Sequence, residues 1–324
     1  MNRIRRGLDT RIMAVIKQKG SDRPATVFAF ARHETFHLRD GWLFKGLNAL
    51  QTDASYLFAE DAHHKLGMGI NMLRSLIYWL QATNLVQLVK SRGSTKPSLE
   101  LTPLARMIWE KDPYFEDMIT LWLLHIELCS NRSLATLWYW AFNEFPQRDF
   151  TEERLAQGLQ RYIEENQTKQ IARSSIIKDV HCFLRTYISS SNDRSRKLSE
   201  YEVLECPLAS LGLLRGSAIP GHYKFQVGSH RNLPASLFAY SLYRFRDAAR
   251  EKDITLSLED VRWAPLSPGR ILRLDIHAIS EYLDRIEHLT AYARMIRTAD
   301  LNMIVLDESI KTADLLTGCY AEGY

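Results

Sequence analysis

Apolar residues follow two different spacings along the chain, and each spacing predicts a different element. Phe28, Phe30, Phe36 and Leu38 recur at every second position, which predicts an extended segment from residue 28 to residue 39. Helical spacing predicts one helix beginning near Thr151 and a second over residues 176–187. A further helix is expected from residue 42 to residue 51. Short strands are expected at residues 224–227 and 302–306, and the polar residues 189–199 are the best linker candidate.

The segment from residue 52 to residue 111 has its own order of predicted elements. It contains two helices separated by a glycine turn, then two strands joined by a polar tip, then another helix. The expected bounds are Asp53–Leu66, the turn Gly67–Gly69, Asn71–Ala82, Leu85–Lys90, the tip Ser91–Ser98, Leu99–Thr102, and a helix starting at Pro103. This order is typical of a winged helix-turn-helix, whose second helix enters the DNA major groove.

The second helix of this module has an apolar stripe and an opposite polar face. The residues of the polar face follow helical spacing, and the wing tip adds basic side chains. The predicted DNA contacts are Asn71, Arg74, Ser75 and Tyr78 on the helix and Lys90, Arg92 and Lys96 on the wing. An ordinary amphipathic helix with a solvated polar face, or a protein-interaction module, would carry the same pattern.

These elements predict an α-rich α+β protein. We expect an N-terminal winged helix-turn-helix, a central helical region and a C-terminal mixed α/β domain. The predicted segments are 1–51 (an N-terminal segment), 52–111 (the winged helix), 112–199 (the helical region and linker) and 200–324 (the mixed domain). Residues 256–274 also have a pattern compatible with a second, degenerate winged-helix unit.

Composition narrows the class of protein. The net charge of +4 is mildly basic, which is compatible with nucleic-acid binding without establishing it. The 4 cysteines form no C-x-x-C pair, so buried free thiols are expected. No run approaches the roughly 18 apolar residues of a membrane span, and the apolar run at residues 12–16 is too short for a signal peptide. We therefore expect a cytoplasmic protein with no membrane partner.

Residues His33 to His37 read His-Glu-Thr-Phe-His, which matches the H-E-x-x-H pattern of zinc proteases. That chemistry needs both histidines one turn apart on a helix, with Glu34 as general base. The expected extended backbone instead separates the histidines by roughly 13 Å at about 3.3 Å per residue. A zinc protease is therefore not expected. The alternatives are a structural turn or a site that works without zinc.

Several motifs, in this order, resemble a bacterial SspB-like family with a domain of formerly unknown function. They run from about residue 27 to residue 290 and are Phe30–Gly46 with its His-Glu-Thr-Phe core, Leu66–Met72, Tyr78–Leu80, Asp112–Asp117, Leu121–His125, Pro207–Leu213 and Ser267–Arg270. The family is associated with DNA phosphorothioation and antiphage defence. The resemblance implies a DNA nick that gives sulfur incorporation access to the backbone, with double-stranded DNA and sulfur-transfer proteins as partners. The second histidine is not part of the family motif.

The sequence displays no familiar nuclease signature, so any catalytic residues must come from the polar cluster around His33. His33 is the candidate general base, and Glu34 and Asp40 are hard oxygen ligands suited to Mg²⁺ or Mn²⁺. The basic side chains of Arg32, Arg39 and Lys45 suit phosphate groups. The alternative is a buried ion-pair network that fixes this segment against the winged helix.

Two positions outside this cluster have competing interpretations. Arg270 follows a Ser-Pro-Gly turn that either holds a phosphate or simply caps a helix. His125 lies in an apolar helix, where a core histidine with satisfied hydrogen bonds is the simpler account.

Three functions remain open at this point. The first is a DNA nickase with His33, Glu34, Arg39 and Asp40 as catalytic residues. The second is a non-catalytic DNA-binding subunit that recruits sulfur-transfer partners. The third is a transcription regulator, which gives the His33 cluster no role. A homodimer is compatible with all three.

Overall fold

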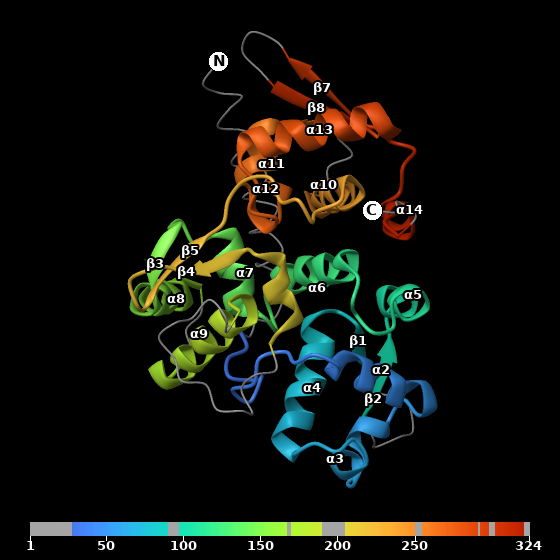
Figure 1. Ribbon diagram of the computed structural model, residues 1–324, viewed down its shortest axis with the longest axis vertical. Coiled ribbons are helices and arrows are strands. Elements are labelled where there is room, and N and C mark those ends of the chain that lie inside the picture. Colours follow the sequence, from blue (N-terminus) through green and yellow to red (C-terminus); the bar gives the residue numbers. More distant parts are fainter. Residues whose placement is uncertain are drawn as a thin grey trace. The chain divides into compact units, whose positions relative to one another are not determined.

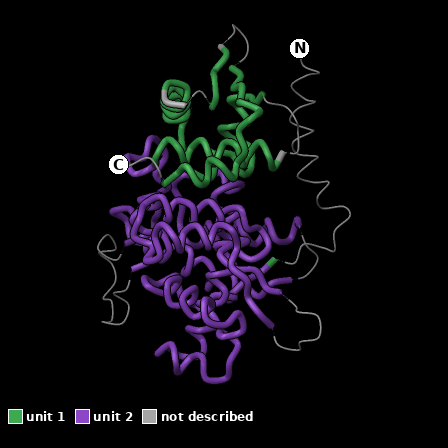
Figure 2. The backbone as a smooth tube through the Cα atoms, turned by 90° about the vertical axis from the view of Figure 1, so that its right-hand side faces the viewer, with its two compact units in different colours: residues 1–28, 234–324 green, residues 29–233 purple. Residues whose placement is uncertain are grey.

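The computed structural model describes residues 28–89, 97–166, 170–189, 205–249, 255–290, 292–297 and 302–320. These residues form two compact units (Figure 2). Unit 2 is Ala29–Leu233, and unit 1 comprises Pro234 onward together with the N-terminal residues through Phe28. Helices dominate both units and the sheets are small and antiparallel (Figure 1). The predicted α-rich α+β class is therefore confirmed.

Unit 2 begins with helices and a hairpin and continues with a longer helical part. The first part contains α2 (Trp42–Thr52), η1 (Tyr56–Phe58), α3 (Ala62–Lys65), α4 (Ile70–Ala82), β1 (Val86–Val89), β2 (Ser98–Leu101) and α5 (Pro103–Lys111). The second part contains α6 (Met118–Ser130), α7 (Thr136–Asn143), β3 (Asp149–Thr151), α8 (Glu152–Asn166), α9 (Arg173–Tyr187), η4 (Pro207–Leu211), β4 (Leu214–Gly216) and β5 (His222–Phe225).

The predicted extended segment from residue 28 to residue 39 is wrong. Residues 32–35 form a turn, in which the Phe36 N–H donates to the His33 carbonyl at 2.8 Å. Ala31, Glu34 and Thr35 adopt positive φ angles of 55°, 49° and 67°. Apolar residues at every second position are typical of a strand. Contacts with helices that are distant in sequence determine the backbone conformation here instead.

The predicted helix from Asp53 to Leu66 is also interrupted. The Asp53 carboxylate accepts hydrogen bonds from the N–H and the hydroxyl of Ser55, which closes a tight turn rather than capping a long helix. Only the short elements η1 and α3 follow. Gly67 then adopts a φ of +63° and turns the chain towards α4, so that the glycine turn lies where it was predicted.

The hairpin and the helix after it follow the prediction closely. Strands β1 and β2 pair antiparallel with Val86 opposite Leu101. Thr102 caps α5 by accepting the Ala105 N–H, and Pro103 occupies the first helical turn, where its missing N–H has no cost.

The core of unit 2 is built around α6. Every residue from Ile119 to Cys129 is buried, so this helix has no solvent-facing side. Asp117 caps its start, and Asp112 accepts from the N–H groups of Glu116 and Asp117. His125 lies inside this core with its Nδ1 2.8 Å from the Tyr187 hydroxyl, which confirms the simpler interpretation of that residue.

A three-stranded sheet joins distant parts of unit 2. Strand β5 pairs with both β3 and β4, in the order β3-β5-β4. Residues 205–233 therefore pack with the central helices. The sequence placed the start of the C-terminal domain at residue 200, and the two compact units divide after Leu233. The linker candidate lies almost entirely outside the described residues.

Unit 1 combines helices with a second three-stranded sheet. Its elements are α10 (Ala235–Ala249), β6 (Thr255–Ser257), α11 (Leu258–Trp263), α12 (Pro268–Ile271), α13 (Ile276–Thr290), β7 (Ala293–Arg297), β8 (Asn302–Leu306) and α14 (Thr312–Gly318). The strands are antiparallel in the order β6-β8-β7. The strand predicted at residues 302–306 is confirmed as β8.

Gly269 provides a test of packing in unit 1. A Cβ at this position would lie 2.5 Å from the Arg262 carbonyl oxygen and 2.7 Å from its Cα. Since backbone atoms cannot move aside as a side-chain tip can, Gly269→Ala is expected to lower the free energy of unfolding by about 1–3 kcal/mol. The matched control is Gly318→Ala, because nothing lies within 4 Å of a Cβ there. Thermal unfolding that is equal in both variants would contradict this packing.

Candidate functional site

The residues around His33 form a buried, hydrogen-bonded polar site in unit 2. His33 is 1% exposed, and its Nε2 lies 3.0 Å from Oδ1 of Asp179 on α9. The same oxygen accepts the Ala31 N–H at 2.6 Å, and the His33 Nδ1 accepts the Thr35 N–H at 3.1 Å. Because Nδ1 is an acceptor, Nε2 carries the ring N–H, which donates a hydrogen bond to the Asp179 carboxylate. Both ring nitrogens are therefore occupied inside the protein.

The Phe36 carbonyl ties this segment to two helices. It accepts the Trp79 indole N–H at 3.1 Å, and the Ser75 hydroxyl and the Cys182 thiol each lie 3.5 Å from it. The Tyr78 ring meets the His33 ring edge-on, with centroids 5.9 Å apart. Helices α4 and α9 are thus joined through the turn that contains His33.

These contacts correct the predicted face of α4. Ser75 is 0% and Tyr78 is 6% exposed, so the prediction that both share the outer polar face is wrong. Burial also raises the pKa of Tyr78 well above its usual value. Asn71 and Arg74 are exposed as expected, and Arg74 donates to the Asn71 amide oxygen at 3.1 Å. The exposed polar face of α4 is therefore narrower than predicted, because part of the predicted face is buried against the turn that contains His33.

Arg39 is half-buried against aromatic rings. Its guanidinium lies over the rings of Phe36 and Trp42, at 5.2 and 5.5 Å from their centroids. Its Nε is buried and has no hydrogen-bond partner among the described residues. Burial lowers the Arg39 pKa, and the positive charge of Arg185 on α9 lowers it further.

The other predicted site residues lie in different surroundings. Arg32 and Asp40 are exposed, and Glu34 is half-buried. Lys45 is exposed with its Nζ 3.5 Å from the Leu66 carbonyl oxygen. Lys90, Arg92 and Lys96 lie outside the described residues.

Arg270 belongs to unit 1, where it follows a helix cap. Its N–H donates to the Ser267 hydroxyl at 3.3 Å, and its Nε donates to the Trp263 carbonyl at 3.1 Å. Its guanidinium also lies 4.9 Å from the Trp263 ring centroid. These contacts fit the interpretation of Ser267 as a plain helix cap.

Asp179 and Arg185 were not found from the sequence, although Asp179 left a signal there. It lies three residues after Ile176 and four before Phe183, both of which are buried on α9. An acidic residue inside an apolar helical stripe needs a buried partner. The sequence alone does not identify which residue that partner is.

The geometry also bears on metals and membranes. Residues 32–35 form a turn rather than a helix, so the helical arrangement that an H-E-x-x-H zinc site requires is not formed. Within the described ranges, no three His, Cys, Asp or Glu side chains gather in a way that suits a metal ion. No helix in the described part of the chain is long and apolar enough to cross a bilayer.

Comparison with known proteins places this chain in one family. Residues 30–320 match the family described as "Protein of unknown function (DUF4007)", and the chain belongs to it. A magnesium-bound SspB crystal structure is similar, with a TM-score of 0.82 and 28% identity over 90% of this chain and 88% of the other. A second SspB crystal structure has the same TM-score and identity over 92% and 90% of the two chains. A search of curated proteins gives no match. The predicted resemblance to the SspB-like family is confirmed.

Asp179→Ala tests whether the buried carboxylate organises this site. The substitution leaves the Ala31 N–H and the His33 Nε2–H without their acceptor, so we expect a loss of about 2–5 kcal/mol in the free energy of unfolding. Glu165→Ala, at an exposed position with no partner side chain among the described residues, should change it by less than about 0.5 kcal/mol. Equal denaturation midpoints for the two variants would contradict this role of Asp179.

Proposed function

We propose that this protein binds double-stranded DNA within a bacterial DNA phosphorothioation and antiphage defence system. The observation that carries the proposal is the similarity to SspB structures over about nine-tenths of the chain. The family resemblance implies this system, with sulfur-transfer proteins as further partners. The proposal places the protein in the cytoplasm, where such DNA is modified.

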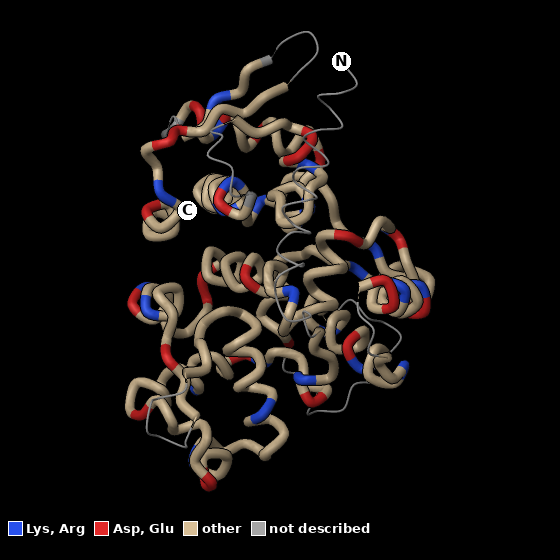
Figure 3. The backbone as a smooth tube through the Cα atoms, turned by 180° about the vertical axis from the view of Figure 1, so that it is seen from behind, with Lys and Arg blue, Asp and Glu red and all other residues tan. Residues whose placement is uncertain are grey.

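The DNA-binding element in this proposal is the winged helix expected at residues 52–111, together with α2 before it. The order helix, short helix, helix, antiparallel hairpin supports it, with α4 as the helix that enters the major groove. The exposed Arg74 and Asn71 are suited to guanine and adenine edges, respectively. Basic and acidic positions are interspersed over the described elements (Figure 3), so the proposal rests on specific side chains rather than on the net charge.

Unit 1 has a related arrangement but a different surface. A helix, a strand, two short helices, a longer helix and a hairpin follow one another, with strand order β6-β8-β7. This order of elements supports a second winged helix that spans most of unit 1. The sequence pattern indicated such a unit only for residues 256–274. The exposed side of α13 carries Glu281 and Asp284 beside Arg285. Because phosphates are repelled by carboxylates, we assign the DNA contact to α4 and not to α13.

Nicking of DNA is the proposed activity, with the residues around His33 as its site. Arg39 with Arg185 would hold a backbone phosphate, and Arg32 and Lys45 would extend the basic surface. Glu34 and Asp40 are more accessible than His33, so they are the better candidates for activating water or holding Mg²⁺ or Mn²⁺. His33, bound through both ring nitrogens, would position the turn.

A second candidate function is a DNA-binding subunit without catalysis. It is favoured by the two hydrogen bonds that satisfy His33 in the interior. A transcription regulator remains the weaker candidate, because it leaves the buried His33–Asp179 pair without a functional reason.

Arg74→Ala tests the proposed DNA contact of α4. Loss of one guanidinium contact to the duplex should weaken binding roughly 5- to 100-fold and reduce the slope of log affinity against log salt by about 1. Arg154→Ala removes an exposed arginine from α8 and should leave both quantities unchanged. Fluorescence anisotropy with a labelled duplex at several salt concentrations measures them. Identical behaviour of the two variants would remove α4 from the DNA interface.

Nicking is tested with supercoiled plasmid incubated with the protein, with and without Mg²⁺ or Mn²⁺. Conversion to open circles by the wild type, reduced at least about 100-fold in Glu34→Gln or Asp40→Asn, is the expected result. Glu165→Gln serves as the control for a lost surface carboxylate. Tight duplex binding without conversion would identify the non-catalytic subunit instead.

A further inference from the structure

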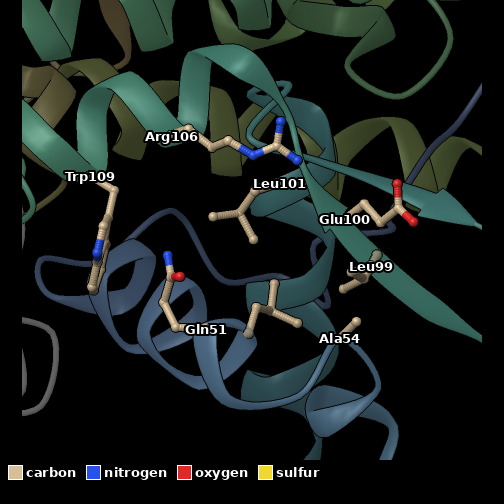
Figure 4. A pocket seen from close by; sticks show the side chains of 8 residues that line it. Gln51, Ala54, Leu99, Glu100, Leu101, Arg106 and Trp109 are labelled. Carbon is tan, nitrogen blue, oxygen red and sulfur yellow. The ribbon is translucent and has the colours of Figure 1, made fainter.

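A cavity of about 380 Å³ lies in unit 2 between α2, β2 and α5 (Figure 4). This volume falls within the roughly 300–1,000 Å³ of small-molecule sites. Leu50, Leu99 and Leu101 supply apolar surface, and the indole of Trp109 forms one side. These side chains are suited to packing against the face of a flat group.

The indole of Trp109 is the end of a column of three aromatic rings. Its ring stacks on Phe44 with centroids 5.7 Å apart and planes 12° apart. The Phe44 ring also stacks on Tyr114, with centroids 4.9 Å apart, and Tyr114 is 59% exposed. A planar aromatic ligand in the cavity would lie against this column, because offset stacking of rings is favourable.

Three polar side chains line the same cavity. They are the amide of Gln51, the carboxylate of Glu100 and the guanidinium of Arg106. In the described part of the chain, none of the three forms a side-chain hydrogen bond or an ion pair. An amide and a carboxylate can pair with the donors and acceptors of a base edge, and a guanidinium can pair with a phosphate.

We propose that this cavity binds one unstacked nucleotide, with its base against Trp109 and its phosphate at Arg106. The aromatic column selects a flat ring, and the mixture of amide, carboxylate and guanidinium selects a ring with polar edges joined to an anion. The nucleotide belongs either to an opened DNA strand, which rests on the proposed function, or to the free nucleotide pool.

The test measures binding of a fluorescein-labelled thymidine decamer and of an abasic decamer with the same number of phosphates. Ala54→Leu adds a side chain where the exposed Ala54 lines the cavity, and Arg106→Ala removes the cation. Ala59→Leu and Arg154→Ala are the matched controls at exposed positions outside the cavity. Thermal unfolding of each variant verifies that it is folded.

Wild-type protein should bind the thymidine decamer roughly 5- to 100-fold more tightly than the abasic one, because each stacked base contributes to affinity. Ala54→Leu should abolish this difference, Arg106→Ala should weaken binding of both oligomers, and the controls should match the wild type. Equal affinity of the wild type for the two oligomers, or wild-type behaviour of Ala54→Leu, would overturn the proposal.

Two further measurements separate this site from the proposed function and identify the nucleotide's source. The proposed duplex contacts Asn71 and Arg74 do not line the cavity, so duplex affinity should be the same in Ala54→Leu and the wild type. A protein that binds the decamer but no duplex would refute only the proposed function. Competition with thymidine monophosphate identifies the source: displacement of the decamer assigns the cavity to free nucleotides, and resistance assigns it to a DNA strand.

Discussion

The hydrogen bonds accepted by Asp179 are the constraint on which the rest of this site depends. A single carboxylate oxygen takes the Ala31 N–H and the His33 imidazole N–H in the interior of unit 2. A buried carboxylate is costly unless donors surround it, and a buried imidazole likewise needs partners for both nitrogens. Each group therefore makes the burial of the other tolerable, and neither would be stable there alone.

This pairing explains how the backbone near His33 can hold an unusual conformation. Residues other than glycine with positive φ cost roughly 1–3 kcal/mol each when the surroundings force them into a sparsely populated region. Ala31, Glu34 and Thr35 all have positive φ, yet the Phe36 carbonyl and the His33 ring lock the turn from both sides. The result is a rigid turn that presents Glu34 and Arg32 from a fixed backbone.

Parts of the fold were predictable from the sequence because their causes are local. The bounds of α4, the hairpin β1–β2 and the start of α5 depend on a glycine turn, on strand-forming residues and on the pair Thr102–Pro103. The His33 turn could not be predicted in the same way, because its partner Asp179 is 146 residues away in sequence. The apolar residues at every second position there favoured a strand. Long-range hydrogen bonds stabilise a turn instead.

The same distinction applies to the candidate site residues on α4. Spacing correctly grouped Asn71 and Arg74 on the exposed side, since their separation of three residues is a property of the helix itself. Spacing alone could not reveal that Ser75 and Tyr78 face inward, because the buried partner is the turn around His33 and not another helix face.

One helix thus serves two purposes. Its outer side carries Asn71 and Arg74, while its inner side receives the Phe36 carbonyl through Ser75 and Trp79. A DNA contact that shifted α4 would pull directly on the turn that presents Glu34, because the connection passes through hydrogen bonds and close ring contacts with little slack. The exposed side of α4 and the His33 turn are therefore joined by direct contacts within unit 2.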